Sequence, residues 1–399
     1  MPWGPSLATS RRSEARRAGS LDALVSGREI VITCGAGGVG KTTTAAAIAA
    51  QAAVYHGGRV LVVTVDPARR LGSALGLDRF GNEARRVPAE AFTAAGVEPR
   101  GELWAAMLDT KQSWDDLVRR HAPDRQTAAR ILENPLYQNI AGKFVQSHDY
   151  IAMERLYELH VEGRYDLIVV DTPPTRNAID FIEAPERMAD FFSSRLLRLL
   201  IGPYRNRFVN LASRPFYQIA DRILGSQFLA DIAEFFILFQ TMYEGFVNRA
   251  RAVERLLEDR RTTFVVVSTL DAAAAHEAES FVQLLAAKRF PVGALVLNRV
   301  LPDYLRDPEA ARAAGLVVEH AAPLAQRLAG SLGTDADQLE RVLLEIGDNF
   351  LNFRVVAGAE AAQREELSAV PDVVATVPEF DTDIHDVAGV LRLGAQIWG

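Results

Sequence analysis

A glycine-rich stretch near the amino end constrains the fold of this chain more than any other feature. Residues 35–44 read GAGGVGKTTT and stand between a β-branched run, EIVITC from Glu29, and an alanine-rich segment, TTTAAAIAAQAAVYHG. Strand, glycine loop and helix in this order are the context that a phosphate-binding loop requires. In such a loop the backbone N–H groups approach phosphates, and the helix N-terminus adds partial positive charge.

The side chains at the end of the loop have the chemistry that a bound nucleotide needs. Lys41 is placed to reach the β and γ phosphates, and Thr42 to ligate magnesium. The alternative is a glycine turn with an exposed lysine, but the chain has only four lysines, so a chance match is rare. We therefore predict ATP or ADP with Mg²⁺ as ligands. The candidate nucleotide-binding residues in the loop are Gly35, Gly37, Gly38, Val39, Gly40, Lys41, Thr42 and Thr43.

Short, continuously apolar runs recur along the chain and predict an α/β fold. Such runs fit strands that helices cover on both faces, and the segments between them are rich in Ala and Leu. We expect the three-layer fold of phosphate-loop NTPases, with a mostly parallel sheet of about six to eight strands. The six runs are EIVITC, RVLVVTV, DLIVVD, TFVVVSTL, GALVLN and DVVATV.

The distances between these runs suggest how the chain is divided. Residues 1–20 contain two arginine pairs without an apolar stretch and are expected to form a mobile tail. Residues 21–182 and 263–399 would form the two parts of the core, the second with a helical stretch over 301–370. Residues 183–262 are too long for a simple connection and predict an inserted helical subdomain.

Charge and cysteine content exclude several classes of protein. The 44 basic and 51 acidic side chains leave a net charge of −7, which argues against a nucleic-acid partner. One cysteine, Cys34, can form neither an internal disulfide nor a thiolate metal site, and is most simply a buried apolar side chain. No run of eighteen apolar residues occurs, so we expect a cytoplasmic protein whose contact with membranes is peripheral or through a partner.

Two aspartates follow predicted strands at the edge where open parallel sheets bind their ligands. Asp66 ends the run VLVVTVD, and Asp171 ends DLIVVD. Phosphoryl transfer needs one carboxylate to orient the attacking water and another near the magnesium. Either aspartate alone is more simply a strand-end or helix-capping residue, but both with the loop favour a role in hydrolysis. The candidate catalytic residues are thus Lys41 and Asp66, and the candidate metal ligands are Thr42, Asp66 and Asp171.

Four segments together, GAGGVGKTT, VDPARRLGSAL, DTPPTRNAIDFIEAP and LVLNRV, resemble the arsenite and anion pump-driving ATPases. Relatives of that family target tail-anchored membrane proteins. The resemblance implies that Asp66 is the water-orienting residue of a first switch, and that residues 171–175 form a second. It also implies that Asn298 reads the adenine base, with Pro378 and Glu379 in a loop nearby. Without the resemblance, Asn298 is equally a residue that caps a strand.

The family pattern has departures here. Members usually carry, at the position of Ala36, a lysine that reaches the nucleotide of a partner subunit. Its absence makes self-sufficient catalysis questionable. The family's paired cysteines are also missing, and the seven histidines include no close pair, which disfavours a histidine metal site.

Two further groups have competing interpretations. Lys111, with Asp109, Asp115 and Asp116, fits a solvated helix face, or else a phosphate contact that replaces the missing lysine. An aromatic stripe fits a helix core, or else a surface for hydrophobic clients as in the targeting relatives. The stripe consists of Phe228, Phe235, Phe236, Phe239, Tyr243 and Phe246.

The sequence therefore favours a Mg²⁺-dependent ATPase. It would work as a homodimer, or as a heterodimer with a homologous chain, and couple hydrolysis to opening and closing of the helical subdomain. The output would be anion export through a membrane transporter or the handling of a hydrophobic client. The alternative is a nucleotide-binding regulatory subunit of a heterodimer with little activity of its own, which Ala36 favours.

Overall fold

The structure is a computed structural model of the chain, and it describes most of its length. The described residues are 20–65, 70–77, 81–141, 145–172, 183, 187, 190, 226–367 and 373–398. The predicted tail, Asp66 and most of residues 173–225 lie outside these ranges. Within them, no helix combines the length and apolar character needed to cross a bilayer.

An eight-stranded sheet forms the centre of the described molecule, in the order β3-β4-β2-β5-β1-β6-β7-β8. Neighbouring strands are parallel except β3 and β4. All six predicted runs are strands, and the expected α/β fold is confirmed. The strands are β1 (Ile30–Cys34), β2 (Arg59–Thr64), β3 (Arg85–Arg86), β4 (Glu102–Met107), β5 (Leu167–Asp171), β6 (Thr262–Ser268), β7 (Val292–Val300) and β8 (Val373–Pro378).

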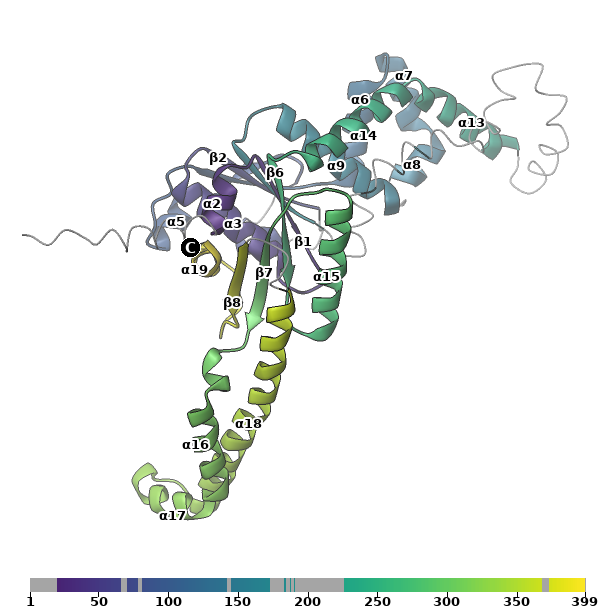
Figure 1. Cartoon of the computed structure of the whole chain (residues 1–399). Helices are drawn as coiled ribbons and strands as arrows, with labels where there is room; N and C mark the ends of the chain where they lie inside the picture. Colours follow the sequence, from purple (N-terminus) through teal and green to yellow (C-terminus); the bar gives the residue numbers. More distant parts are fainter. Residues whose placement is uncertain are drawn as a thin grey trace, which may run out of the picture.

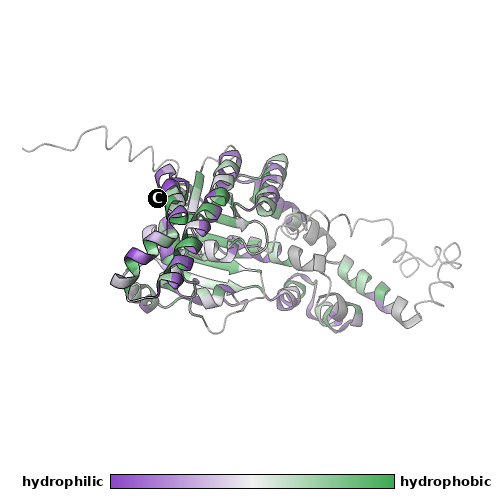
Figure 2. Cartoon of the chain, turned by 90° about the horizontal axis from the view of Figure 1, so that it is seen from below, coloured by the Kyte–Doolittle hydropathy of each residue, from purple (hydrophilic) through white to green (hydrophobic). Residues whose placement is uncertain are grey.

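Helices cover both faces of the apolar strands (Figure 2). On one face α3 packs with α19, and alternate strand residues such as Val31 and Val169 point toward them. On the other face α9, α14 and α15 meet the intervening residues, such as Ile32 and Ile168. The helices that flank the sheet are α2 (Leu21–Ser26), α3 (Lys41–Tyr55), α4 (Arg70–Ala74), α5 (Ala89–Ala94), α9 (Val145–Val161), α14 (Tyr243–Glu258), α15 (Ala272–Ala287) and α19 (Val387–Trp398).

The helix that follows the glycine loop is held at short distance from its neighbours. From Ala45 to Ala50 every side chain of α3 is fully buried. Gln51 donates a hydrogen bond from Nε2 to the Leu391 carbonyl of α19 at 3.0 Å. Small side chains allow this close approach, so the position of the loop depends on alanine at these sites.

A helical region lies at one end of the sheet (Figure 1). Its core contains Trp114, Tyr137, Phe235 and Phe239, so segments before and after residues 173–225 share it. This region is wider than the predicted insertion, whose boundaries at 183 and 262 stay a prediction. Besides α9 and α14 it contains α6 (Thr110–His121), α7 (Arg125–Glu133), α8 (Pro135–Ala141) and α13 (Ser226–Gln240).

A second helical segment leaves the sheet at β7 and returns at β8. Figure 1 shows it standing away from the sheet as an arm. Its elements are the 3-10 helix η1 (Asp303–Arg306), α16 (Pro308–Glu319), α17 (Ala321–Leu332) and α18 (Ala336–Leu367). The arm lies within the predicted helical stretch over 301–370, whose boundaries stay a prediction.

The tight packing of α3 leads to a stability prediction. Ala49→Leu adds three carbon atoms where no space exists, and we expect it to lower the free energy of unfolding by about 1–3 kcal/mol. The matched control is Ala313→Leu on the exposed side of α16. Urea unfolding followed by circular dichroism measures both variants. An Ala49→Leu midpoint equal to that of the control would contradict this packing argument.

Candidate nucleotide site

The glycine loop between β1 and α3 has a backbone that requires glycine at two positions where other elements approach closely. Gly35 has φ +148°, and a Cβ atom there would lie 2.0 Å from the Val267 carbonyl oxygen. Gly40 has φ +97°, and its Cβ atom would lie 2.3 Å from Nδ2 of Asn298. The ends of β6 and β7 therefore lie in close contact with the loop, and a side chain at Gly35 or Gly40 would displace the loop.

Lys41 begins α3 and points back into the loop. Its Nζ donates a hydrogen bond to the Ala36 carbonyl at 2.7 Å, and the side chain is only 7% exposed. A buried ammonium beside the backbone of a glycine-rich loop suits a phosphate anion. The predicted contact of Lys41 with the β and γ phosphates stays a prediction.

Directly beside the loop, Asp171 accepts hydrogen bonds from hydroxyl groups of two other elements. Thr42 Oγ1 donates to Asp171 Oδ2 at 2.7 Å, and Thr64 Oγ1 donates to the same oxygen at 2.8 Å. Asp171 is fully buried at the carboxyl end of β5. The structure thus brings together Lys41, Thr42 and Asp171, three of the predicted site residues.

Sequence reasoning missed Thr64. It is the last residue of β2, two positions before Asp66. A hydroxyl at the end of an otherwise apolar strand was the available indication, but only the pairing of β2 with β5 places it on Asp171.

The oxygen atoms at this point match a hard divalent cation. Magnesium prefers hydroxyl, carboxylate and water oxygens at about 2.0–2.1 Å, which places neighbouring ligands about 3 Å apart. The separation of Thr42 Oγ1 and Asp171 Oδ2, 2.7 Å, is close to that value. Thr42 and Asp171 could therefore hold Mg²⁺. The third predicted ligand, Asp66, lies outside the described residues.

The predicted adenine contacts are at the other side of the loop. Asn298 in β7 is buried and donates from Nδ2 to the Val39 carbonyl at 2.8 Å. Pro378, exposed at the end of β8, pairs with Val300 of β7. Asn298 therefore supports the loop directly, and the contact of either residue with adenine stays a prediction.

A cavity of about 610 Å³ opens beside the loop and is strongly acidic. This volume is in the range of about 300–1,000 Å³ that is typical of ligand sites. Hydrogen bonds from the Thr269 side chain and the Ala274 N–H lower the pKa of Asp271, which is therefore ionised at neutral pH. The lining includes Ala36, Gly37, Gly38, Val39, Asp271, Glu277, Arg299, Glu360 and Glu379.

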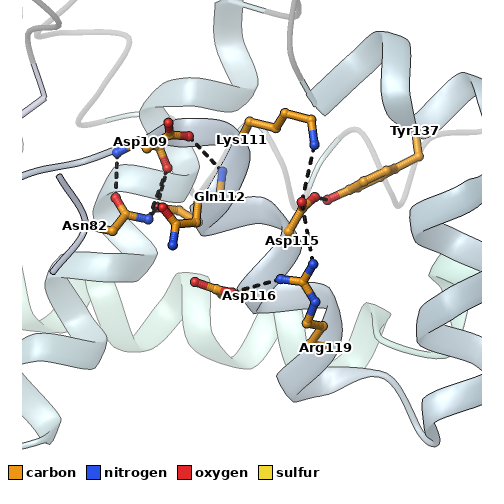
Figure 3. A network of polar contacts seen from close by, with 9 residues as sticks. Asn82, Asp109, Lys111, Gln112, Asp115, Asp116, Arg119 and Tyr137 are labelled. Carbon is orange, nitrogen blue, oxygen red and sulfur yellow. Dashed lines mark hydrogen bonds and ion pairs between the residues drawn. The ribbon is translucent and has the colours of Figure 1, made fainter.

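The remaining candidates from the sequence can be placed by their burial and contacts. Figure 3 shows Lys111 paired with Asp115 at 3.3 Å, and the Tyr137 hydroxyl donating to the same aspartate. This network supports the interpretation as a solvated face. Cys34 is fully buried, and burial raises the pKa of its thiol. In the aromatic stripe, Phe235, Phe236 and Phe239 are buried, whereas the side chains of Phe228, Tyr243 and Phe246 lie outside the description.

One group with the geometry of a metal site lies in the helical region. The ligand atoms of His121, Glu154 and Glu158 lie within 4.8 Å of one another. Arginines already neutralise the two carboxylates, since Arg249 pairs with Glu154 and Arg155 with Glu158. Burial and then Arg249 lower the pKa of His121, whose Nδ1 lies 3.2 Å from Arg249 Nη1. We interpret this group as a polar junction between α6, α9 and α14.

The fold and this site define an ATP-binding protein of the phosphate-loop class, and comparison with known proteins narrows the class. The model of the anion-transporting ATPase family matches residues 28–314. An ATPase GET3 of Lodderomyces elongisporus is 26% identical over 276 residues, or 67% of this chain and 71% of that protein. An ATPase get3 of Aspergillus terreus is 26% identical over 71% of this chain and 76% of its own.

A bacterial relative is similar to the same degree. The uncharacterized protein SCO2128 of Streptomyces coelicolor is 30% identical over 285 residues, or 69% of this chain and 63% of that protein. The match to the family model covers well over half of the chain. The chain therefore belongs to the anion-transporting ATPase family, and it is an ATPase.

A substitution of Thr64 tests whether its hydrogen bond to Asp171 supports metal binding or only contributes to packing. Thr64→Val removes a hydrogen bond to Asp171, and we expect about 10- to 100-fold weaker activation by Mg²⁺, as loss of a ligand's supporting group usually gives. The control is Thr33→Val, because Thr33 is equally buried but donates to the Val170 carbonyl instead. ATP turnover titrated with MgCl₂ measures the effect. Equal curves for both variants would show that Thr64 does not support a metal ligand.

Proposed function

We propose that this ATPase hydrolyses ATP with Mg²⁺ at the carboxyl edge of the sheet and works as a dimer with its own or a homologous chain. The observation that carries the proposal is the contact of Thr42 with buried Asp171, directly beside the loop that contains Lys41. Nothing else in the described chain combines a phosphate cradle with hard oxygen donors in this way.

The chain's own residues would divide the work. The loop amides and the Lys41 ammonium would hold the phosphates, with Lys41 exchanging its bond to the Ala36 carbonyl for one to phosphate. Thr42 and Asp171 would hold Mg²⁺, which when bound neutralises phosphate charge. Asp66 would orient the attacking water, and residues 171–175 would respond to the γ phosphate. Asn298 and Pro378 would face the base.

The helical region would be the output of the cycle. α14 packs on the sheet beside β6 and joins the aromatic core through Ala250. A change at the nucleotide edge could therefore reach Phe235 and Phe239, which are buried in the described state. A hydrophobic client would need the region to open first. The family model describes anion transport, which supports a membrane transporter as the other partner, with the ATPase on its cytoplasmic side.

The division of roles between Lys41 and Asp66 can be tested directly. Lys41→Ala should abolish ATP binding, because the phosphates lose their buried cation. Asp66→Asn should leave binding nearly intact and lower turnover by about 10²-fold. Lys111→Ala is the matched lysine control, since that side chain is exposed and paired with Asp115. Fluorescent-nucleotide binding and phosphate release measure the two effects, and loss of binding in Asp66→Asn would make Asp66 a structural residue.

A second function has a specific observation in its favour. Ala36 supplies no cation, and the cavity that it lines contains the carboxylates of Asp271, Glu277, Glu360 and Glu379. This chain is thus better suited to receive a basic side chain than to lend one. A regulatory subunit that binds nucleotide and turns it over slowly until a homologous chain supplies a lysine fits this arrangement.

The missing lysine gives a prediction that can be tested in two ways. One charge-assisted contact to phosphate is worth roughly 1.5–3 kcal/mol, so Ala36→Lys should raise turnover of the isolated protein by about 10- to 150-fold. A homologous chain that keeps the lysine should have a similar effect on the wild type when mixed with it. Ala273→Lys, which places a lysine in the same cavity from α15, is the control. Brisk turnover by the unmixed wild type, with no gain in Ala36→Lys, would exclude this repair.

A further inference from the structure

Most of the strongly exposed large apolar side chains in the described residues lie in the arm. Eleven large apolar side chains are strongly exposed in the described residues, and only Tyr55, Val161 and Tyr304 lie outside α16, α17 and α18. The match to the family model ends at residue 314, so α17 and α18 lie beyond it. The exposed apolar residues of α16, α17 and α18 are Leu316, Leu328, Leu332, Val342, Ile346, Phe353, Val355 and Val356.

One face of α18 is already occupied by the arm itself. Gly347 is buried, and a Cβ atom there would lie 2.4 Å from Cγ2 of Val318 and 3.2 Å from the Ala314 carbonyl. α16 therefore crosses α18 at Gly347 so closely that a side chain there would have no room. The question is whether the exposed apolar residues of α18 lie on this occupied face or on another face of the helix.

Most of the exposed residues of α18 form a regular stripe, which we call the seam. It consists of positions 342, 346, 349, 353 and 356, spaced by four, three, four and three residues. Val342, Ile346, Phe353 and Val356 are 42%, 59%, 51% and 49% exposed, and Asn349 is the polar member. These positions lie roughly 100–180° around the helix axis from Gly347. Alternating spacings of three and four are those of helices that pack side by side in coiled coils.

We propose that the seam is an interface at which α18 pairs in parallel with α18 of a second copy of this chain. In a parallel pair each seam residue meets its own equivalent, so the two Asn349 amides can hydrogen-bond to each other. In an antiparallel pair with the alternating core layers of a coiled coil, Asn349 would face Ile346 or Phe353 of the other copy, and its amide would have no partner there. A single polar residue at a core position, usually asparagine at position a, sets the register of such a pair, and Asn349 would do so from position d.

The other occupants fit less well. A membrane-binding helix carries lysine and arginine on its polar face. Over residues 340–356, by contrast, there is no lysine, and the three acidic residues Glu340, Glu345 and Asp348 exceed the two arginines, Arg341 and Arg354. A client helix would not need the asparagine in the middle of the seam. The seam spans only residues 342–356, so it would add to contacts between other parts of the two chains.

Parallel pairing agrees with the position of the arm at the nucleotide edge. Glu360 of α18 accepts a hydrogen bond from the Leu301 N–H at 3.0 Å, just after β7, and also lines the acidic cavity beside the loop. Two parallel arms would place both cavities at the same end of the pair. Only this placement of the two cavities rests on the proposed dimeric ATPase. The pairing of the two α18 helices does not depend on ATP hydrolysis.

Cysteine crosslinking of the full chain without nucleotide tests the pairing. Val356→Cys should form a disulfide-linked dimer under mild oxidation, because equivalent residues meet in a parallel pair. Val355→Cys is the control, since Val355 is more exposed at 73% but points about 100° away. The single native cysteine, Cys34, is buried and adds no background. Equal crosslinking of both variants, or none of Val356→Cys, would overturn the proposal.

The strength of the interface is tested by sedimentation equilibrium. Phe353→Lys should weaken self-association about 10-fold or more, and Val355→Lys should not. Both residues are exposed, and circular dichroism checks that the helices are retained. An unchanged dimer in Phe353→Lys would overturn the arm interface while leaving the proposed dimer intact. A wild type that stays monomeric and floats with anionic vesicles would overturn the pairing and make the arm a membrane contact instead. ATP binding by Phe353→Lys is measured separately and tests the proposed function, not the interface.

Discussion

The carboxylate of Asp171 connects the elements on which the nucleotide site depends. It accepts hydrogen bonds from the hydroxyl groups of Thr42, at the start of α3, and Thr64, at the end of β2. Because it is fully buried, the carboxylate requires such donors or a cation, and each hydrogen bond fixes the position of one strand or helix relative to β5. The same contact that positions the loop also brings together two oxygens of the kind that Mg²⁺ prefers, so the fold and the proposed metal site depend on one group.

Close packing around the loop supports this arrangement from the other side. The Val267 carbonyl and the Asn298 amide leave no space for a side chain at Gly35 or Gly40. The fully buried alanines of α3 bring the helix close to the sheet. A movement of β6 or β7 would therefore change the loop directly. This gives a physical path between the arm, which begins after β7, and the phosphates.

The helical region and the arm differ in what they do with apolar side chains. In the helical region, Phe235 and Phe239 are enclosed by α6 to α9, so their surface is available only after the region opens. In the arm, Ile346 and Phe353 are exposed without any such change. A nucleotide-dependent client surface suits the first, whereas a permanent contact between chains suits the second.

The sequence alone determined the fold class, the six main strands and the phosphate loop, because the spacing of glycines and the continuous apolar runs are local properties. It also indicated Asp171, since strand ends share one edge of a parallel sheet. It did not show Thr64, the sharing of one core by Trp114 and Phe239, or which face of α18 is free. Those depend on which strands are neighbours and on which helix crosses at Gly347, and such contacts between distant segments exist only in the tertiary structure.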